Sequence, residues 1–344
     1  MHFVSSPPFT SHQNINMPRQ VTLHPEYEPM CGAFDISPTD NDLLNMKAFR
    51  DRNNNILPTD SWPEALAEDR VLDIAGRKME VTLVRPIGTE NEKLPVVVYL
   101  HGGGWVFGNK VSHGKLIRDI ANKARVAIVF PDYAMAPEAI FPAAAEECYA
   151  VVRWVVEHGA DELNVDPTKL AVAGDSAGGN LSAAVSLITK DRLELPADTI
   201  KTQILLYPSV APPIDESSFE SYRLFGARGE YALNFYDTKR CNDLYSGIQD
   251  PSAVNDNKYR FPLVASREEL CGVAPCLMIV CEADTLRDEG EAYARKLLEA
   301  GVATTSIRVN GTTHGYMQHP AETAPYLQTL AMITFQLNEA FGRD

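Results

Sequence analysis

The chain has no long hydrophobic run and no cluster of basic residues. None of its apolar stretches approaches the ~20 residues that a helix needs to span a bilayer, so we expect no transmembrane segment. Lys and Arg together number 31, against 46 Asp and Glu, which gives a formal net charge of −15. Nucleic acids and anionic membranes attract clustered positive charge, so this acidic chain is expected to bind neither.

The features of a secreted or zinc-binding protein are also missing. Residues 1–20 are polar, without the positively charged start and the apolar run of a secretory signal. Six cysteines are scattered along the chain, and the three nearest one another, Cys271, Cys276 and Cys281, match no zinc-binding spacing. We therefore interpret the cysteines as reduced structural thiols of a cytoplasmic protein, and we expect neither a metal nor another cofactor.

The chain does show a regular alternation of apolar strands with helices. The strands are expected at 71–74, 79–85, 94–100, 126–130, 169–173, 203–207, 276–281 and 305–309. The helices are expected at 112–124, 143–157, 177–190, 289–300 and 321–341. Apolar strands without polar alternation are typical of a sheet buried on both faces, so we predict an α/β fold with a mostly parallel sheet flanked by helices. The strand at 305–309 is expected at the sheet edge, where it could pair in a homodimer.

One stretch interrupts this alternation. Residues 208–270 contain no strong strand pattern but many aromatic side chains. Because a structureless loop of this length is uncommon inside a compact domain, we interpret the stretch as a helical insertion. Its aromatic residues are expected to form the core of the insertion rather than a ligand pocket.

Ser176 is the candidate nucleophile. It lies in the motif Gly174-Asp175-Ser176-Ala177-Gly178, directly after an apolar strand and before a helix. This context is typical of a nucleophile elbow, a sharp strand-to-helix turn that lifts the serine hydroxyl out of the sheet. Glycines suit both ends of such a turn, because larger side chains would collide with the neighbouring backbone.

A serine hydroxyl needs a base within hydrogen-bond reach, and His314 is the preferred candidate. It follows the expected strand 305–309, and groups beyond the carboxyl ends of parallel strands meet at one edge of the sheet. His319 is the nearest competitor, but it directly precedes Pro320 at the start of a helix.

A third residue must orient the imidazole of the base, and Asp284 is the preferred candidate because it follows the expected strand 276–281. Asp288 and Glu289 are better suited to the first turn of the next helix, where acidic side chains favour the helix dipole. Glu282 stays an open alternative. The order of serine, aspartate and histidine along the chain is that of α/β-hydrolases.

A glycine run provides candidate donors for a negatively charged oxygen. Gly102-Gly103-Gly104 directly follows the expected strand 94–100, so bare backbone N–H groups can approach an oxyanion there. Ala177, the residue after the candidate nucleophile, supplies a further N–H at a helix N-terminus.

These motifs together resemble the hormone-sensitive-lipase-like carboxylesterases of the α/β-hydrolase superfamily. The matching segments, in the order of that family, are His101-Gly102-Gly103-Gly104-Trp105, 133–138, 174–180, 284–290 and His314-Gly315-Tyr316. One departure is Ala134-Met135, where the family usually has Arg-Leu, and we expect only a local change in packing from it.

The resemblance implies an α/β-hydrolase fold with a helical cap over the site. It implies Ser176 as the nucleophile, Asp284 rather than Glu282 as the acid, and His314 as the base. The residues implied for the oxyanion hole are Gly103, Gly104 and Ala177, with His101, Gly102 and Asp175 in support. The cap is expected from residues 1–65 and 212–266, and the catalytic core from 66–211 and 267–344.

These expectations describe a serine carboxylesterase. It would hydrolyse short- to medium-chain or other small carboxylic esters through an acyl-enzyme, and it would need no cofactor. A deacetylase, lactonase or thioesterase would use the same three residues. A non-catalytic ligand receptor on this scaffold is disfavoured because serine, aspartate and histidine are all present.

Overall fold

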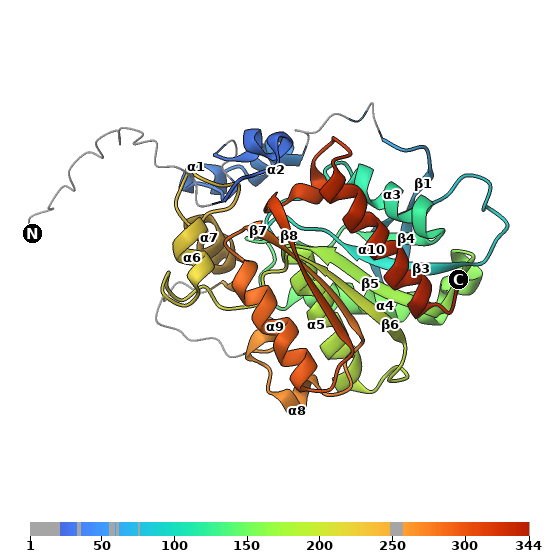
Figure 1. Cartoon of the computed structure of the whole chain (residues 1–344). Helices are drawn as coiled ribbons and strands as arrows, with labels where there is room; N and C mark the ends of the chain where they lie inside the picture. Colours follow the sequence, from blue (N-terminus) through green and yellow to red (C-terminus); the bar gives the residue numbers. More distant parts are fainter. Residues whose placement is uncertain are drawn as a thin grey trace, which may run out of the picture.

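The apolar runs of the sequence form the strands of one sheet (Figure 1). The computed structural model of the protein describes residues 21–32, 36–54, 59, 62–74, 76–247 and 257–343. The strands are β1 (Leu66–Ile74), β2 (Arg77–Arg85), β3 (Leu94–Leu100), β4 (Ala127–Pro131), β5 (Val165–Asp175), β6 (Ile200–Leu206), β7 (Cys276–Ala283) and β8 (Thr304–Thr313). Their spatial order is β1-β2-β4-β3-β5-β6-β7-β8. The pairs β1–β2 and β2–β4 are antiparallel, and the other five are parallel. The predicted α/β fold with a mostly parallel sheet is confirmed.

Five long helices cover the two faces of this sheet. They are α3 (Gly114–Ala124), α4 (Ala143–Glu162), α5 (Ala177–Arg192), α9 (Arg287–Glu299) and α10 (Ala324–Ala340). Strand β3 shows why both faces need covering, because all of its residues are buried. Val97 and Tyr99 pack with side chains of α3 and α10, whereas Val96 and Val98 pack on the opposite face with side chains of α4 and α5.

Four shorter helices lie together beside one end of the sheet (Figure 1). They are α1 (Asp40–Leu43), α2 (Met46–Asn54), α6 (Glu220–Phe225) and α7 (Phe235–Ser246). Contacts join the two chain segments from which they come. The hydroxyl of Ser37 donates to Asp237 Oδ1 at 2.6 Å, and Arg240 forms an ion pair with Asp40 at 2.7 Å. Part of the predicted cap lies outside the described residues, namely 1–20, 33–35, 55–58, 60–61 and 248–256.

The interrupted stretch 208–270 contains helices and no strand among its described residues, as predicted; its remaining elements are the 3₁₀ turn η2 (Pro262–Val264) and α8 (Arg267–Leu270). Its aromatic side chains pack mainly against one another: Tyr222 contacts Phe235 with ring centroids 5.0 Å apart, and Phe225 contacts Tyr231 at 5.1 Å. They form a core of the insertion, as expected.

Three strands are at least five residues longer than predicted, because the added residues lack an apolar pattern. β1 begins at Leu66, and Glu68, Asp69 and Arg70 are exposed on this edge strand. β5 begins at Val165, which pairs with β3 before a shift of register interrupts the ladder. β8 continues to Thr313 through polar residues and a glycine. Apolar runs therefore locate strands buried on both faces but miss strand segments made mostly of polar residues, whether these are exposed or buried.

The edge position of β8 is confirmed by the strand order. No disulfide joins any two of the six cysteines, all of which lie in the described part of the chain. Among the described residues no helix is both long and apolar enough to cross a bilayer.

The core under α10 provides a test of the packing. Leu337 is completely buried on the inner side of this helix, whereas Phe335 is 66% exposed. We expect Leu337→Ala to lower the free energy of unfolding by about 2–5 kcal/mol, because it leaves a cavity in the core. Phe335→Ala should change it by less than about 0.5 kcal/mol. Urea unfolding of both variants measures the difference, and equal losses would contradict this packing.

Candidate active site

Ser176 occupies the sharp turn between β5 and α5. Its backbone dihedral angles are φ +54° and ψ −118°, a conformation that side chains rarely adopt. The turn is held because the Ser176 N–H donates to the carbonyl of Leu206 at 2.8 Å. Gly178 makes it sterically feasible: a Cβ at that position would lie 1.9 Å from the carbonyl oxygen of Leu100. The local geometry is that of the predicted elbow.

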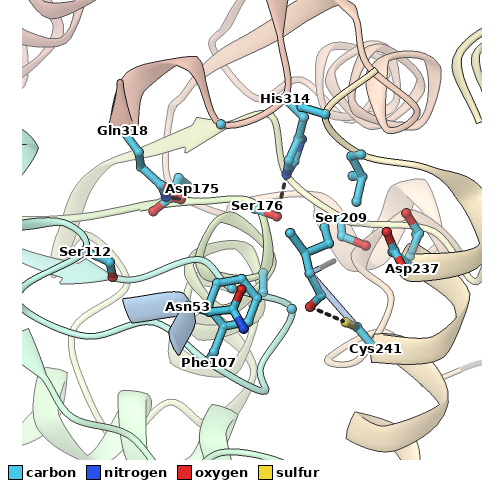
Figure 2. Close-up of a pocket in the computed structure, with 18 of the residues that line it drawn as sticks. Asn53, Phe107, Ser112, Asp175, Ser176, Ser209, Asp237, Cys241, His314 and Gln318 are labelled. Carbon is cyan, nitrogen blue, oxygen red and sulfur yellow. Dashed lines mark hydrogen bonds between the residues drawn. The ribbon is translucent and has the colours of Figure 1, made fainter. Parts of the chain in front are cut away.

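A chain of two hydrogen bonds connects the predicted serine, histidine and aspartate. Figure 2 shows the one between Ser176 and His314. His314 Nε2 lies 2.9 Å from Ser176 Oγ, and His314 Nδ1 lies 2.8 Å from Asp284 Oδ2. Asp284 is buried, and its other oxygen accepts the N–H of Leu286 at 2.9 Å. A carboxylate only accepts, so Nδ1 of His314 carries a hydrogen and Nε2 is free to take the serine proton.

The alternative candidates for the acid and the base form hydrogen bonds with other groups. Glu282 accepts the N–H of Gly311 at 2.7 Å, Asp288 that of Ser221 at 2.7 Å, and Glu289 that of Val210 at 2.6 Å. Burial raises the pKa of Glu289 to about 8. The ring of His319 lies against Tyr27 and accepts the N–H of Ala321 at 3.2 Å through Nδ1. The structure therefore brings together the preferred trio and none of its rivals.

The glycine run forms a tight loop beside Ser176. Gly103 has φ +110°, and a Cβ there would lie 2.2 Å from the carbonyl oxygen of Phe107. Its carbonyl accepts the N–H groups of Val106 and Phe107, both at 3.0 Å. Within the described chain, neither Gly103 nor Gly104 donates its N–H to another residue. With the N–H of Ala177 at the start of α5, these groups can receive a negatively charged oxygen.

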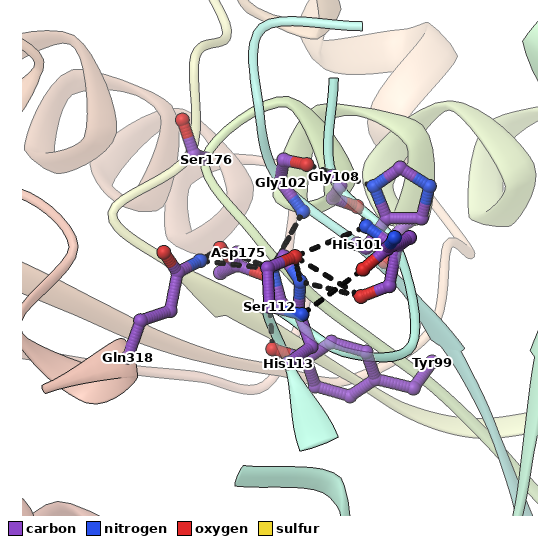
Figure 3. A network of polar contacts seen from close by, with 12 residues as sticks. Tyr99, His101, Gly102, Gly108, Ser112, His113, Asp175, Ser176 and Gln318 are labelled. Carbon is purple, nitrogen blue, oxygen red and sulfur yellow. Dashed lines mark hydrogen bonds and ion pairs between the residues drawn. The ribbon is translucent and has the colours of Figure 1, made fainter. Parts of the chain in front are cut away.

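Asp175, directly before the candidate nucleophile, is the centre of a polar network (Figure 3). The carboxylate is completely buried. Three donors reach it: the hydroxyl of Tyr99 at 2.9 Å, the N–H of Gly102 at 3.1 Å and Nε2 of Gln318 at 2.6 Å. His113 adds a contact from Nε2 at 3.1 Å. Asp175 thus links the glycine loop to the segment that follows His314.

Sequence reasoning missed three of these partners: Tyr99, His113 and Gln318. His113 carried a weak signal, because a histidine at a helix start is an uncommon N-cap residue. Tyr99 and Gln318 carried none. They reach Asp175 only because the fold brings three separate chain segments together.

The electrostatics of the network keep Asp175 charged and His101 neutral. Burial alone would raise the pKa of Asp175, but His113 and the hydroxyl of Tyr99 outweigh it and lower that pKa below its usual value. Burial lowers the pKa of His101 to about 3. The neutral ring of His101 can then donate through Nδ1 to the carbonyl of Gly102 at 2.8 Å. His101 therefore supports the glycine loop, as the resemblance implied, and does not face Ser176.

A cavity of about 360 Å³ opens in front of Ser176 and His314. Figure 2 shows Gln318 on one side of Ser176 and Asp237 and Cys241 on the other. Most of the lining is apolar, and its apolar residues include Pro29, Met30, Ile36, Phe107, Leu233 and Leu286. No aromatic side chain of the described insertion lines it. Across the described chain, no three His, Cys, Asp or Glu side chains are grouped to hold a metal ion.

The comparisons with known proteins agree with this geometry. The sequence model of the alpha/beta hydrolase fold family matches residues 97–318. A solved fungal esterase from Rhizomucor miehei is 40% identical, with a TM-score of 0.83, and the match covers 93% of this chain and 98% of that one. An arylesterase of Saccharolobus solfataricus is 32% identical over 81% of this chain and 85% of its own length. The carboxylesterase NlhH of Mycobacterium tuberculosis is 32% identical over 76% and 78%.

The Asp175 network leads to a prediction about both activity and stability. Asp175→Asn keeps the shape but removes the charge that three donors share, so we expect kcat/KM to fall at least about tenfold and the free energy of unfolding to fall by about 1–3 kcal/mol. Because folding lowers the pKa of Asp175, its carboxylate stabilises the fold above the ordinary value of 3.8, and this contribution disappears as the pH falls below it.

The difference in unfolding free energy between the wild type and Asp175→Asn should therefore shrink as the pH falls from about 5 to about 3. Urea unfolding at both pH values measures it, with the exposed Asp161→Asn as the matched control. A difference that stays constant with pH would contradict a charged Asp175.

Proposed function

We propose that this chain, which belongs to the alpha/beta hydrolase fold family, hydrolyses carboxylic esters of small molecules with Ser176 as its nucleophile. The chain is a carboxylic ester hydrolase, like the esterases that match it over most of its length. The observation that supports the assignment of residues is the hydrogen-bonded series of Ser176, His314 and Asp284 at the wall of the cavity.

The reaction would begin with His314. Its Nε2 accepts the proton of Ser176 as Oγ attacks the ester carbonyl. Nδ1 keeps its hydrogen and donates a hydrogen bond to Asp284. The carboxylate thereby holds the ring in the required tautomer and stabilises the imidazolium that forms. No proton needs to move to Asp284.

The negative charge that develops on the carbonyl oxygen would be received by backbone donors. We assign this role to the N–H groups of Gly103, Gly104 and Ala177. They are fixed before the substrate arrives, because the loop and the helix start are both held by hydrogen bonds. Loss of one such donor costs about 2.7–4 kcal/mol of activation free energy in a comparable site.

The tetrahedral intermediate would collapse when His314 gives its proton to the leaving alcohol. An acyl group then remains on Ser176. A water molecule then attacks the acyl carbonyl while His314 removes a proton from that water. His314 returns the proton to Ser176 Oγ, and the acid is released. Each step uses only side chains and backbone groups of this chain.

We also propose that the helices α1, α2, α6 and α7 form a cap over the cavity. Asn53 on α2 and Cys241 on α7 line the cavity, so both chain segments help to close it. A cavity of about 360 Å³ holds a small or medium ester but not a long acyl chain in an enclosed position.

The exposed edge of the sheet supports a further proposal, a homodimer formed through β8. Most residues from Thr304 to Arg308 are exposed or half-buried, and the outer side of the strand has no partner strand among the described residues. Unpaired strand edges offer hydrogen bonds to a second chain. Sedimentation velocity at micromolar concentrations should show a dimer. Sedimentation of a monomer alone at every concentration up to about 100 μM would contradict the proposed dimer.

The nucleophile is tested most directly with p-nitrophenyl esters from acetate to palmitate. We expect activity to peak at short or medium chains, and Ser176→Ala to lose at least about a thousandfold in kcat, because residual catalysis without a triad member is small. Ser218→Ala, at an exposed serine away from the cavity, is the matched control and should keep full activity. A fluorophosphonate probe should label the wild type and the control but not Ser176→Ala. Undiminished turnover by Ser176→Ala would refute the mechanism.

A further inference from the structure

Gln318 connects the Asp175 network to the substrate cavity. It ends the short 3₁₀ turn η3 (Tyr316–Gln318), which follows His314 and Gly315. The turn is closed by the Gln318 N–H, which donates to the carbonyl of Gly315 at 2.9 Å. Gln318 lines the same cavity as Ser176 and His314.

The orientation of the Gln318 amide is determined by its neighbours. Nε2 lies 2.6 Å from Oδ2 of Asp175, and a carboxylate only accepts hydrogen bonds. The same nitrogen lies 2.8 Å from Nε2 of His113, which also accepts the N–H of Gly102 at 3.2 Å. Rotating the amide by half a turn would place its oxygen against Oδ2 of the buried carboxylate, so two acceptors would face each other and Asp175 would lose one of its three donors. The nitrogen therefore faces Asp175, and the oxygen faces away from it.

The oxygen on the other side of this amide faces the cavity. Oε1 lies 4.0 Å from the place where a Cβ of Gly315 would stand, and Gly315 is also part of the cavity lining. Within the described chain no residue donates a hydrogen bond to Oε1. Figure 3 shows the nitrogen of Gln318 on the side of Asp175 and the oxygen on the opposite side of the amide.

We propose that Gln318 Oε1 is a fixed hydrogen-bond acceptor for the substrate, and that the preferred ester carries a hydroxyl or N–H group that donates to it. The inference rests on the proposed function, because it concerns the ester that is held beside Ser176. A fixed acceptor selects such a donor because its orientation is already set before binding, so little rotational freedom is lost when the bond forms.

The expected preference is moderate. Gln318 is half-buried, so its oxygen can keep a water partner when a plain ester binds. The plain ester therefore forgoes only the net free energy of one neutral hydrogen bond. We expect kcat/KM to be about five- to tenfold higher for the hydroxylated member of a matched ester pair.

Two pairs of esters, called the alcohol arm and the acyl arm, show whether the hydrogen-bond donor belongs to the alcohol part or to the acyl part of the substrate. The alcohol arm compares 3-hydroxypropyl acetate with propyl acetate. The acyl arm compares ethyl 3-hydroxybutyrate with ethyl butyrate. Acid release in a pH-stat gives kcat/KM for all four, and the ratio of hydroxylated to plain ester within each arm is the readout. The preference should be present in at least one arm.

Two variants separate recognition from positioning. Gln318→Met removes both the donor to Asp175 and the acceptor. Gln318→Lys keeps a donor for Asp175 but has no acceptor. Gln336→Met, the same substitution on α10, is the matched control, since the amide of Gln336 contacts Thr202 and not the cavity.

We expect the ratio to fall to about one in both Gln318 variants and to stay at the wild-type value in Gln336→Met. The inference is overturned if the wild type shows no preference in either arm, or if both Gln318 variants keep the ratio. A lower rate on plain esters in Gln318→Met with an unchanged ratio would likewise overturn it, because Gln318 would then only position Asp175. Failure of the proposed function is distinct, since it would appear as turnover that survives Ser176→Ala.

Discussion

The buried carboxylate of Asp175 is the interaction on which the geometry of the site depends. Its donors come from β3, from the glycine loop and from the segment after His314, and the next residue in the chain is Ser176. A completely buried charge is costly unless donors surround it, so the three segments are held together by the cost of leaving the carboxylate unpaired. Movement of any one of them would change the distance between the serine, its base and the backbone donors.

The parallel sheet supplies the second constraint, because it brings the chemical groups to one edge. Asp284 and His314 directly follow Ala283 and Thr313, which pair across β7 and β8. Ser176 directly follows Asp175, the last residue of β5 paired with β6. Strand register therefore determines the separation of these side chains, and the short distances around His314 follow from it. The strained turn at Ser176 adds the final displacement that places Oγ beside the imidazole.

These constraints explain which parts of the site could be predicted from the sequence. Ser176, Asp284 and His314 each follow a run of apolar residues, so a strand pattern was enough to suggest that they meet. The fold class followed from the same runs. The partners of Asp175 could not be found in this way, because Tyr99 and Gln318 reach it from other segments and belong to no local pattern. The outer strands were underestimated for a related physical reason. β1 faces solvent, and the end of β8 consists of Asn310, Gly311 and two buried threonines, so neither segment has an apolar run.

The two sides of the cavity differ in how freely they can change. The side formed by α7 presents Cys241 and Asp237, which contact Ile36 and Ser37 in the N-terminal segment of the proposed cap. Cys241 lies against Gly104 and therefore constrains the glycine loop, whereas substitutions at Asp237 can reshape the space for substrate while the backbone donors and His314 stay in place. Gln318, on the other side, shares its amide with the carboxylate that positions the glycine loop. An apolar side chain at this position would remove the acceptor for the substrate and also a donor to Asp175. It would therefore affect substrate binding and the position of the glycine loop together, unlike a side chain that still donates a hydrogen bond to Asp175. The substrate range of this fold is therefore easiest to alter from the α7 side, whereas the Gln318 side is constrained by the chemistry that it supports.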